Sequence, residues 1–133
     1  MKKIGLIFYL LIFVNCTTKT TPETSAAVFP GCESVETSEL ENCFYTKLNQ
    51  HISDNVEYHE IAQEYGITGT VYVEFIVDED GDIIELQTRG PDKNLVKEAR
   101  RIIMKLPKMT PAKIKGRTEK TEFSTRITFN LED

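Results

Sequence analysis

We predict an α+β fold in which helices cover one face of a three-stranded antiparallel sheet. Three observations support this prediction. A strand, a turn and a second strand run from Thr70 to Arg89, an amphipathic helix follows, and the chain closes with an alternating strand from Thr121 to Leu131. The order of elements is helix, short helix, strand, strand, helix, strand. A sheet with one buried face needs a packing layer, which the helices supply.

The first helix is predicted to begin at Ser38, because apolar residues then recur at every fourth position. Ser38 and Glu41 also fit a capping box at its start. A short second helix is expected from Glu57 to Tyr65, with Gly66 as its C-terminal cap. The apolar stripe of the first helix consists of Leu40, Phe44, Leu48 and Ile52.

The segment from Thr70 to Val77 is the clearest strand, because it is β-branched and aromatic and is bounded by glycine turns. Asp78 to Asp82 reverses the chain, and Ile83 to Arg89 returns as the second strand. The acidic turn resembles a calcium loop in composition. However, Gly81 is the fourth residue counted from Asp78, whereas the EF-hand loop places glycine sixth. We therefore predict a hairpin turn with no metal bound.

A third helix is predicted after Asp92, which can cap it. Pro107 and Pro111 prevent its continuation, and Met109 to Lys113 is expected to run as an extended crossover to Lys115–Arg117. The helix carries a single apolar stripe, made of Leu95, Val96, Ala99, Ile102, Ile103 and Leu106.

The last strand, Thr121 to Leu131, alternates between two faces. The inward positions are apolar except for Thr125. The outward positions are polar and are occupied by Glu122, Ser124, Arg126, Thr128 and Asn130.

The N-terminus has the pattern of an export signal. Residues 1–15 are predicted to be a signal peptide, since Lys2 and Lys3 precede the apolar run from Ile4 to Val14, which is shorter than the roughly 20 residues of a spanning helix. Phe13 to Cys16 resembles a bacterial lipobox, so Cys16 is the predicted lipidation site. The alternatives are an ordinary cleaved signal peptide and an uncleaved anchor.

Residues 16–27 are polar and are predicted to form a flexible tether, so the folded domain is expected to span residues 28–133. A tether of this length averages about 20 Å from end to end. The domain would therefore stay close to the membrane that holds Cys16.

The three cysteines also fit an exported protein, because lipidation of Cys16 leaves Cys32 and Cys43 as a pair for a disulfide. The cysteines and the two histidines match no zinc pattern, and no catalytic constellation stands out. We expect a non-catalytic protein without a metal or cofactor. The net charge of −5, or −7 without Lys2 and Lys3, argues against nucleic acid as a partner.

Several segments in order resemble the TonB C-terminal domain family, in particular its short Bacteroidetes forms. They cover about residues 40–131 and are Asn55–Tyr58, Ala62–Val71, Phe75–Gly81, Ala99–Ile103, Leu106–Gly116 and Phe129–Leu131. One departure is His59, where the family usually has proline; we interpret it as a tolerated loop residue. A complete TonB also has an inner-membrane helix and a long proline-rich segment, which this sequence does not show. A role as a whole energy transducer is therefore not expected.

The resemblance implies a binding mode for the domain. An extended peptide of an envelope protein, in the family a motif of a TonB-dependent receptor, would pair with the last strand, flanked by its outward polar residues. This predicts a periplasm-facing lipoprotein, with the outer membrane favoured and a link to TonB-dependent transport. The alternative is a structural envelope lipoprotein that forms a homodimer through the same edge.

Overall fold

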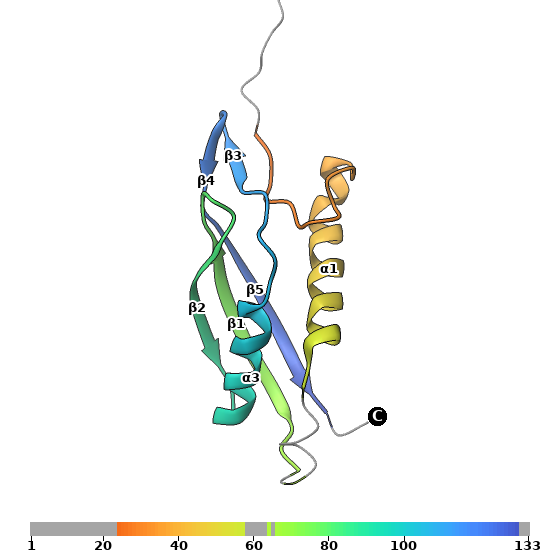
Figure 1. Ribbon diagram of the computed structural model, residues 1–133, viewed down its shortest axis with the longest axis vertical. Helices are drawn as coiled ribbons and strands as arrows, with labels where there is room; N and C mark the ends of the chain where they lie inside the picture. The colour runs from red at the N-terminus through yellow and green to blue at the C-terminus, as the bar shows by residue number, and fades with distance from the viewer. Residues whose placement is uncertain (1–23, 58–63, 65, 131–133) are drawn as a thin grey trace, which may run out of the picture.

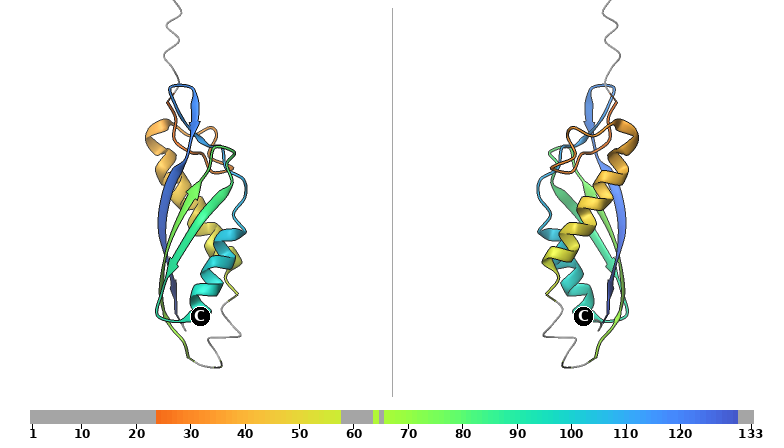
Figure 2. Two further views of the ribbon diagram at one scale, coloured as in Figure 1. Left: turned by 90° about the vertical axis from the view of Figure 1, so that its left-hand side faces the viewer. Right: turned by 90° about the vertical axis from the view of Figure 1, so that its right-hand side faces the viewer.

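The central feature of the fold is a three-stranded antiparallel sheet with the strand order β2-β1-β5. The computed structural model describes residues 24–57, 64 and 66–130. The strands are β1 (Gly69–Val77), β2 (Ile83–Arg89) and β5 (Thr121–Phe129). Helices α1 (Leu40–Asn55) and α3 (Lys93–Met104) lie on the same side of this sheet (Figures 1 and 2). The predicted α+β fold is confirmed.

The core forms between the sheet and the two helices, because each element has one apolar face. The inward side chains of β1 are fully buried, and the apolar stripes of α1 and α3 cover them. The predicted stripe of α1 and the alternation of β1 are both confirmed. The buried residues of these three elements are Leu40, Phe44, Leu48, Ile52, Val71, Val73, Phe75, Val77, Leu95, Ala99, Ile102 and Ile103.

The predicted helix ends differ in how well they match. Asp92 caps α3 as expected, since its Oδ1 accepts hydrogen bonds from the N–H groups of Asn94 and Leu95 at 2.8 Å and 3.2 Å. Such a bond satisfies a donor that the first turn of a helix leaves open. The capping box of Ser38 and Glu41 is wrong. α1 is preceded by a 3₁₀ turn, η1 (Thr37–Glu39), and its N-cap residue Glu39 makes no side-chain capping bond. The Glu39 N–H instead donates to the Glu36 carbonyl within that turn.

The predicted helix from Glu57 to Tyr65 lies mostly outside the described residues. Gly66, its expected cap, has a left-handed φ of 61°. The last strand ends at Phe129, and Leu131, its predicted end, lies outside the described residues.

A second, smaller sheet stands where an extended crossover was expected. Strands β3 (Ala112–Ile114) and β4 (Arg117–Glu119) form an antiparallel hairpin at one end of the molecule (Figure 1). Its turn residues Lys115 and Gly116 both have positive φ values, 52° and 79°. Tight two-residue hairpin turns require such values. The strands are too short for their alternation to be visible in the sequence.

The N-terminal boundary of the folded part also differs from the prediction. Ser25 pairs with Lys113 and Val28 pairs with Thr110 through antiparallel bridges. Ala27, which was expected in the flexible tether, is 4% exposed. The ordered part therefore begins upstream of Val28, because β3 and the segment before it offer main-chain partners to this segment.

The predicted disulfide between Cys32 and Cys43 is present, with the two Cα atoms 6.1 Å apart. It links the segment before α1 to the helix itself. Next to it, the rings of Phe29 and Phe44 meet edge to face with their centroids 5.6 Å apart. This is a favourable geometry for two aromatic rings.

Candidate functional site: the outer edge of β5

β5 is an edge strand of the sheet and carries the predicted binding residues. It pairs with β1 over nine residues without a shift in register, from Thr121 opposite Val77 to Phe129 opposite Gly69. Within the described part of the chain, the sheet order places no strand on its other side. An edge of this kind can accept another strand.

The register shows which main-chain groups of β5 point to that edge. In antiparallel pairs, close side-chain contacts mark the pairs that do not exchange hydrogen bonds. The hydroxyl groups of Thr70 and Thr128 lie 3.1 Å apart across the strands, which fits such a pair. Because the two kinds of pair alternate, the main-chain groups of the even-numbered residues point away from β1. These residues are Glu122, Ser124, Arg126 and Thr128.

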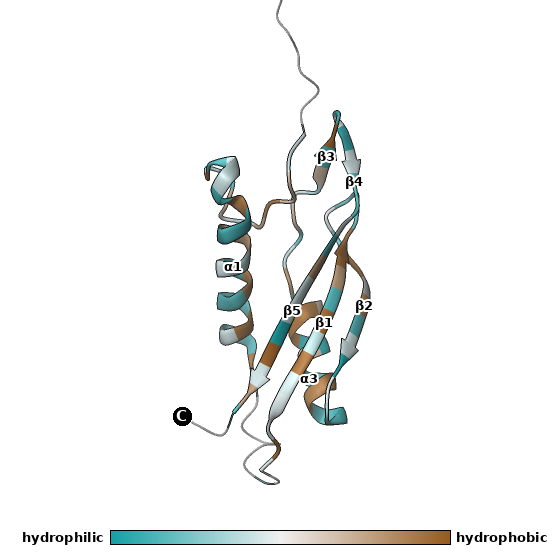
Figure 3. Cartoon of the chain, turned by 180° about the vertical axis from the view of Figure 1, so that it is seen from behind, coloured by the Kyte–Doolittle hydropathy of each residue, from teal (hydrophilic) through white to brown (hydrophobic). Residues whose placement is uncertain are grey.

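The same four residues have exposed side chains on the open face of the sheet, opposite the helices. Figure 3 shows that neither α1 nor α3 crosses this face. A strand added to β5 would therefore meet their side chains on one face and their N–H and C=O groups along the edge. Asn130, the fifth predicted residue, is exposed and lies just after the strand.

The opposite edge of the sheet, formed by β2, is less suitable for strand addition. Its register with β1 shifts between Ile84 and Gln87, which makes a bulge. The guanidinium group of Arg100 on α3 also donates to the main-chain carbonyl of Leu86 at 3.1 Å. A bulge and a covering cation are common ways of closing a sheet edge. The structure therefore leaves β5 as the regular edge.

Helix α1 lies alongside β5 on the inner face (Figure 1). The Phe44 ring stacks on Phe123 of β5 with centroids 4.1 Å apart, and Phe123 in turn stacks near Phe75 of β1 at 5.6 Å. These aromatic contacts hold β5 between its neighbouring strand and the helix. The hydroxyl of Tyr45 on α1 reaches the main-chain carbonyl of Ser124 at 3.5 Å.

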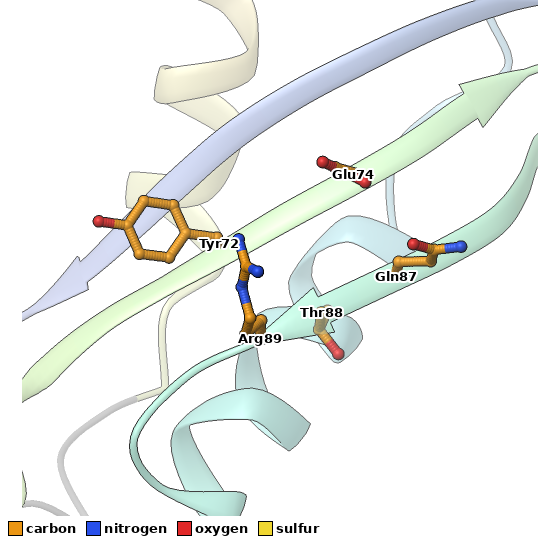
Figure 4. Close-up of a pocket in the computed structure, with 5 residues that line it drawn as sticks. All are labelled: Tyr72, Glu74, Gln87, Thr88 and Arg89. Carbon is orange, nitrogen blue, oxygen red and sulfur yellow. The ribbon is translucent and has the colours of Figure 1, made fainter.

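A row of three residues, an exposed tyrosine between two arginines, runs across the three strands on the open face of the sheet. Tyr72 on β1 is opposite Arg89 on β2 and opposite Arg126 on β5. Tyr72 is 51% exposed, and the Arg89 guanidinium carbon lies 6.0 Å from its ring centroid (Figure 4). At that separation the cation is attracted to the face of the ring. Sequence reasoning missed this row, because it depends on the register of three strands.

Comparison with known proteins adds the family. Residues 54–131 match the family described as Gram-negative bacterial TonB protein C-terminal. The chain belongs to the TonB C-terminal family.

Solved structures of the family support the same fold. Two solution structures of the Helicobacter pylori TonB C-terminal domain each share 24% sequence identity with this chain. The first has a TM-score of 0.55 and covers 69% of this chain and 84% of that one. The second has a TM-score of 0.52 and covers 68% and 96%. No curated protein matches the sequence.

TonB C-terminal domains are interaction modules of the cell envelope, so the membership fits a binding role for the chain. Across the described residues, no helix is both long and apolar enough to cross a membrane. Cys16 and the predicted signal peptide lie outside those residues, and so does His59.

The acidic turn after β1 has a structural role in this family member. The Oδ1 atom of Asp78 accepts hydrogen bonds from the N–H groups of Asp80 and Asp82, both at 2.9 Å. The carboxylates of the three aspartates approach within 4.8 Å of one another. Asp78 thus braces the hairpin, as the turn interpretation predicts.

A polar clamp that joins α1 to α3 was not foreseen from the sequence. Arg101 forms an ion pair with Glu98 and donates to the Asn55 carbonyl at the end of α1, while the Glu57 N–H donates to Glu98. The hydrogen bond from Arg101 is the main cause that lowers the pKa of Glu98, against the effect of burial. The same contact raises the pKa of Arg101.

His51 belongs to the same contact between helices. Its Nε2 lies 2.8 Å from the Ile102 carbonyl oxygen. A carbonyl can only accept, so this nitrogen donates. The role of His51 in the described structure is therefore to join α1 to α3.

Proposed function

We propose that this TonB C-terminal family member binds an extended segment of an envelope protein by strand addition along β5. The observation that carries the proposal is the difference between the two sheet edges. β5 is regular over nine residues, whereas β2 is bent by a bulge beside which Arg100 bonds the Leu86 carbonyl. Main-chain hydrogen bonds would supply affinity, and side chains on alternate positions would supply specificity.

Membership of the family supports the partner class that we propose. The proposed guest is the N-terminal plug segment of a TonB-dependent receptor or a comparable extended segment of another envelope protein. We further propose that the chain is a lipoprotein anchored through Cys16 and facing the periplasm. Intact-mass measurement of the protein extracted from envelopes tests this anchor, since a mass without an attached lipid contradicts it.

Titration of the full chain with synthetic receptor plug peptides tests strand addition. Saturable NMR shift changes are expected at the amides of Arg126 and Thr128, because these N–H groups point to the outer edge. The absence of saturable binding across the peptide set, with these amides unmoved, would refute the proposal.

A matched pair of proline variants locates the edge. Thr128→Pro removes an N–H that points to the outer edge of β5. Thr88→Pro removes an N–H that points to the outer edge of β2, because Thr88 and Val73 form a pair that does not exchange hydrogen bonds. Both residues are threonines on edge strands, where proline is tolerated. Only Thr128→Pro should abolish peptide binding. An equal loss of peptide binding in both variants would indicate that proline weakens binding by destabilising the folded protein, and not by removing an N–H from the binding edge.

Self-association is a second candidate, because the charges of β5 are self-complementary. In an antiparallel pairing of two β5 strands centred on Ser124, Glu122 of each copy faces Arg126 of the other. The N–H and C=O groups of Glu122, Ser124 and Arg126 all point away from β1, so these groups of the two copies could form hydrogen bonds with each other in this register. Two cross-strand ion pairs would favour this homodimer.

A further inference from the structure

Tyr45 places a side-chain hydroxyl on the edge that strand addition would use. It lies on the flank of α1 opposite Cys43, is half-buried, and donates its hydroxyl to the Ser124 carbonyl at 3.5 Å. Its ring meets Phe44 edge to face at 5.7 Å, and Phe44 is stacked on Phe123. The tyrosine is therefore held in place by the same aromatic contacts that join α1 to β5.

The carbonyl that Tyr45 occupies is one that an added strand would need. Ser124 lies four residues before Thr128 in an unshifted register, so its main-chain groups point to the outer edge as those of Thr128 do. An antiparallel guest would donate an N–H to this carbonyl. A carbonyl oxygen can accept two hydrogen bonds, but the guest N–H and the Tyr45 hydroxyl would both approach this one from the outer edge. The guest and the hydroxyl thus compete for the space beside the Ser124 carbonyl.

The outward groups downstream of Ser124 have no such competitor. Among the described residues, no side chain donates to the main chain of Arg126 or Thr128, and both side chains are exposed. The edge is therefore divided into a segment that ends at Ser124, held by α1, and a segment from Arg126 onward that is open.

We propose that Tyr45 is a specificity-determining residue, which confines an added strand to the part of β5 from Arg126 onward. The proposal rests on strand addition at β5 and names its register and length. A short extended peptide would bind without disturbing Tyr45. A longer strand, including a second copy of β5 centred on Ser124, would first have to displace the hydroxyl and leave it without its partner.

Two lengths of the same receptor plug peptide test this restriction. In the wild-type full chain, a nine-residue peptide should bind no more tightly than its five-residue core. In Tyr45→Phe the ring packing stays and the hydroxyl is removed, so the longer peptide should gain roughly threefold or more in affinity, as expected for one released hydrogen bond. Tyr72→Phe is the matched control. It removes a hydroxyl from the open face of β1, and the affinity ratio should stay at the wild-type value.

The outcomes separate this proposal from strand addition itself. If both peptides bind but the affinity ratio is the same in wild type and Tyr45→Phe, the restriction by Tyr45 is wrong and strand addition stands. If no peptide binds any variant, strand addition is wrong. In that case the ¹³C NMR shift of the Ser124 carbonyl still tests the hydrogen bond from Tyr45, because this shift is measured on the protein without a peptide. A shift that changes in Tyr45→Phe but not in Tyr72→Phe supports the contact, and an unchanged shift overturns it.

Discussion

Gly81 occupies a position that no other residue type fits. Its φ is 86°, and a Cβ atom built there would lie 1.9 Å from the Met109 carbonyl oxygen. The Gly81 carbonyl also accepts a hydrogen bond from the Met109 N–H at 2.9 Å. The hairpin turn between β1 and β2 is thus fastened to the segment after α3.

Gly81→Ala is expected to destabilise the protein by roughly 3 kcal/mol or more, because it combines a left-handed backbone with a steric clash. Gly116→Ala is the matched control. Gly116 has a φ of 79°, and a Cβ atom added there would meet nothing within 4 Å. Only the backbone cost of about 1 kcal/mol therefore applies to the control. Urea unfolding followed by circular dichroism measures both changes. Equal losses would show that the contact with Met109 contributes nothing.

Glu98 makes the stability depend on acid pH. Its pKa lies below the ordinary value of 4.5, mainly because Arg101 donates a hydrogen bond to the carboxylate. A lowered pKa stabilises the folded state above the unfolded pKa, and this contribution is lost as the pH falls through the folded pKa. The side chain is 11% exposed, so solvent screens the contact only partly.

Glu98→Gln should therefore cost about 1.5–3 kcal/mol at pH 7, the range for a hydrogen bond to a charged group. The difference from wild type should shrink as the pH falls below 4.5. Denaturant unfolding at a series of pH values measures this, with the exposed Glu119→Gln as control. A difference that stays constant with pH would contradict the role of the ionised carboxylate.

At the scale of elements, the disulfide fixes the segment before α1 to the helix that flanks β5. Cys32 is fully buried, and Cys43 lies one residue before Phe44, which stacks on β5. The double variant Cys32→Ala/Cys43→Ala is expected to lose somewhat under about 3 kcal/mol, because the bridge closes a short loop. Guanidinium unfolding with and without reductant measures the loss. Reductant should destabilise the wild type and leave the double variant unchanged; insensitivity of the wild type would contradict the prediction.

The elements also show where sequence patterns suffice. Long strands and helices such as β1 and α3 were predicted because their periods extend over many residues. The hairpin of β3 and β4 was missed because its strands have only three residues each. Ser25, which pairs with Lys113 of β3, also lies far upstream in the sequence. The start of α1 was misplaced because Thr37–Glu39 form a 3₁₀ turn, in which main-chain carbonyls accept hydrogen bonds from the N–H groups of Glu39 and Leu40.

At the scale of the whole molecule, the charges of β5 allow a decisive test of self-association. Glu122→Arg alone should weaken a homodimer centred on Ser124, because it sets two pairs of like charges against each other. The double variant Glu122→Arg/Arg126→Glu restores complementarity and should restore the dimer. Sedimentation velocity measures the monomer fraction. A chain that is monomeric in all three forms excludes this dimer, and a dimer unaffected by either change uses another surface.

The sequence by itself determined the order of the long helices and strands, the disulfide pair and the family, because each is written in local periods, in spacings or in a series of short motifs. Only the tertiary structure decided which sheet edge is regular and how much of it is open. Those properties depend on contacts between residues that are apart in the sequence. Arg100 contacts Leu86, 14 positions away, and Tyr45 contacts Ser124, 79 positions away. An edge is defined by what lies beside it in space, and no pattern within β5 records that neighbour.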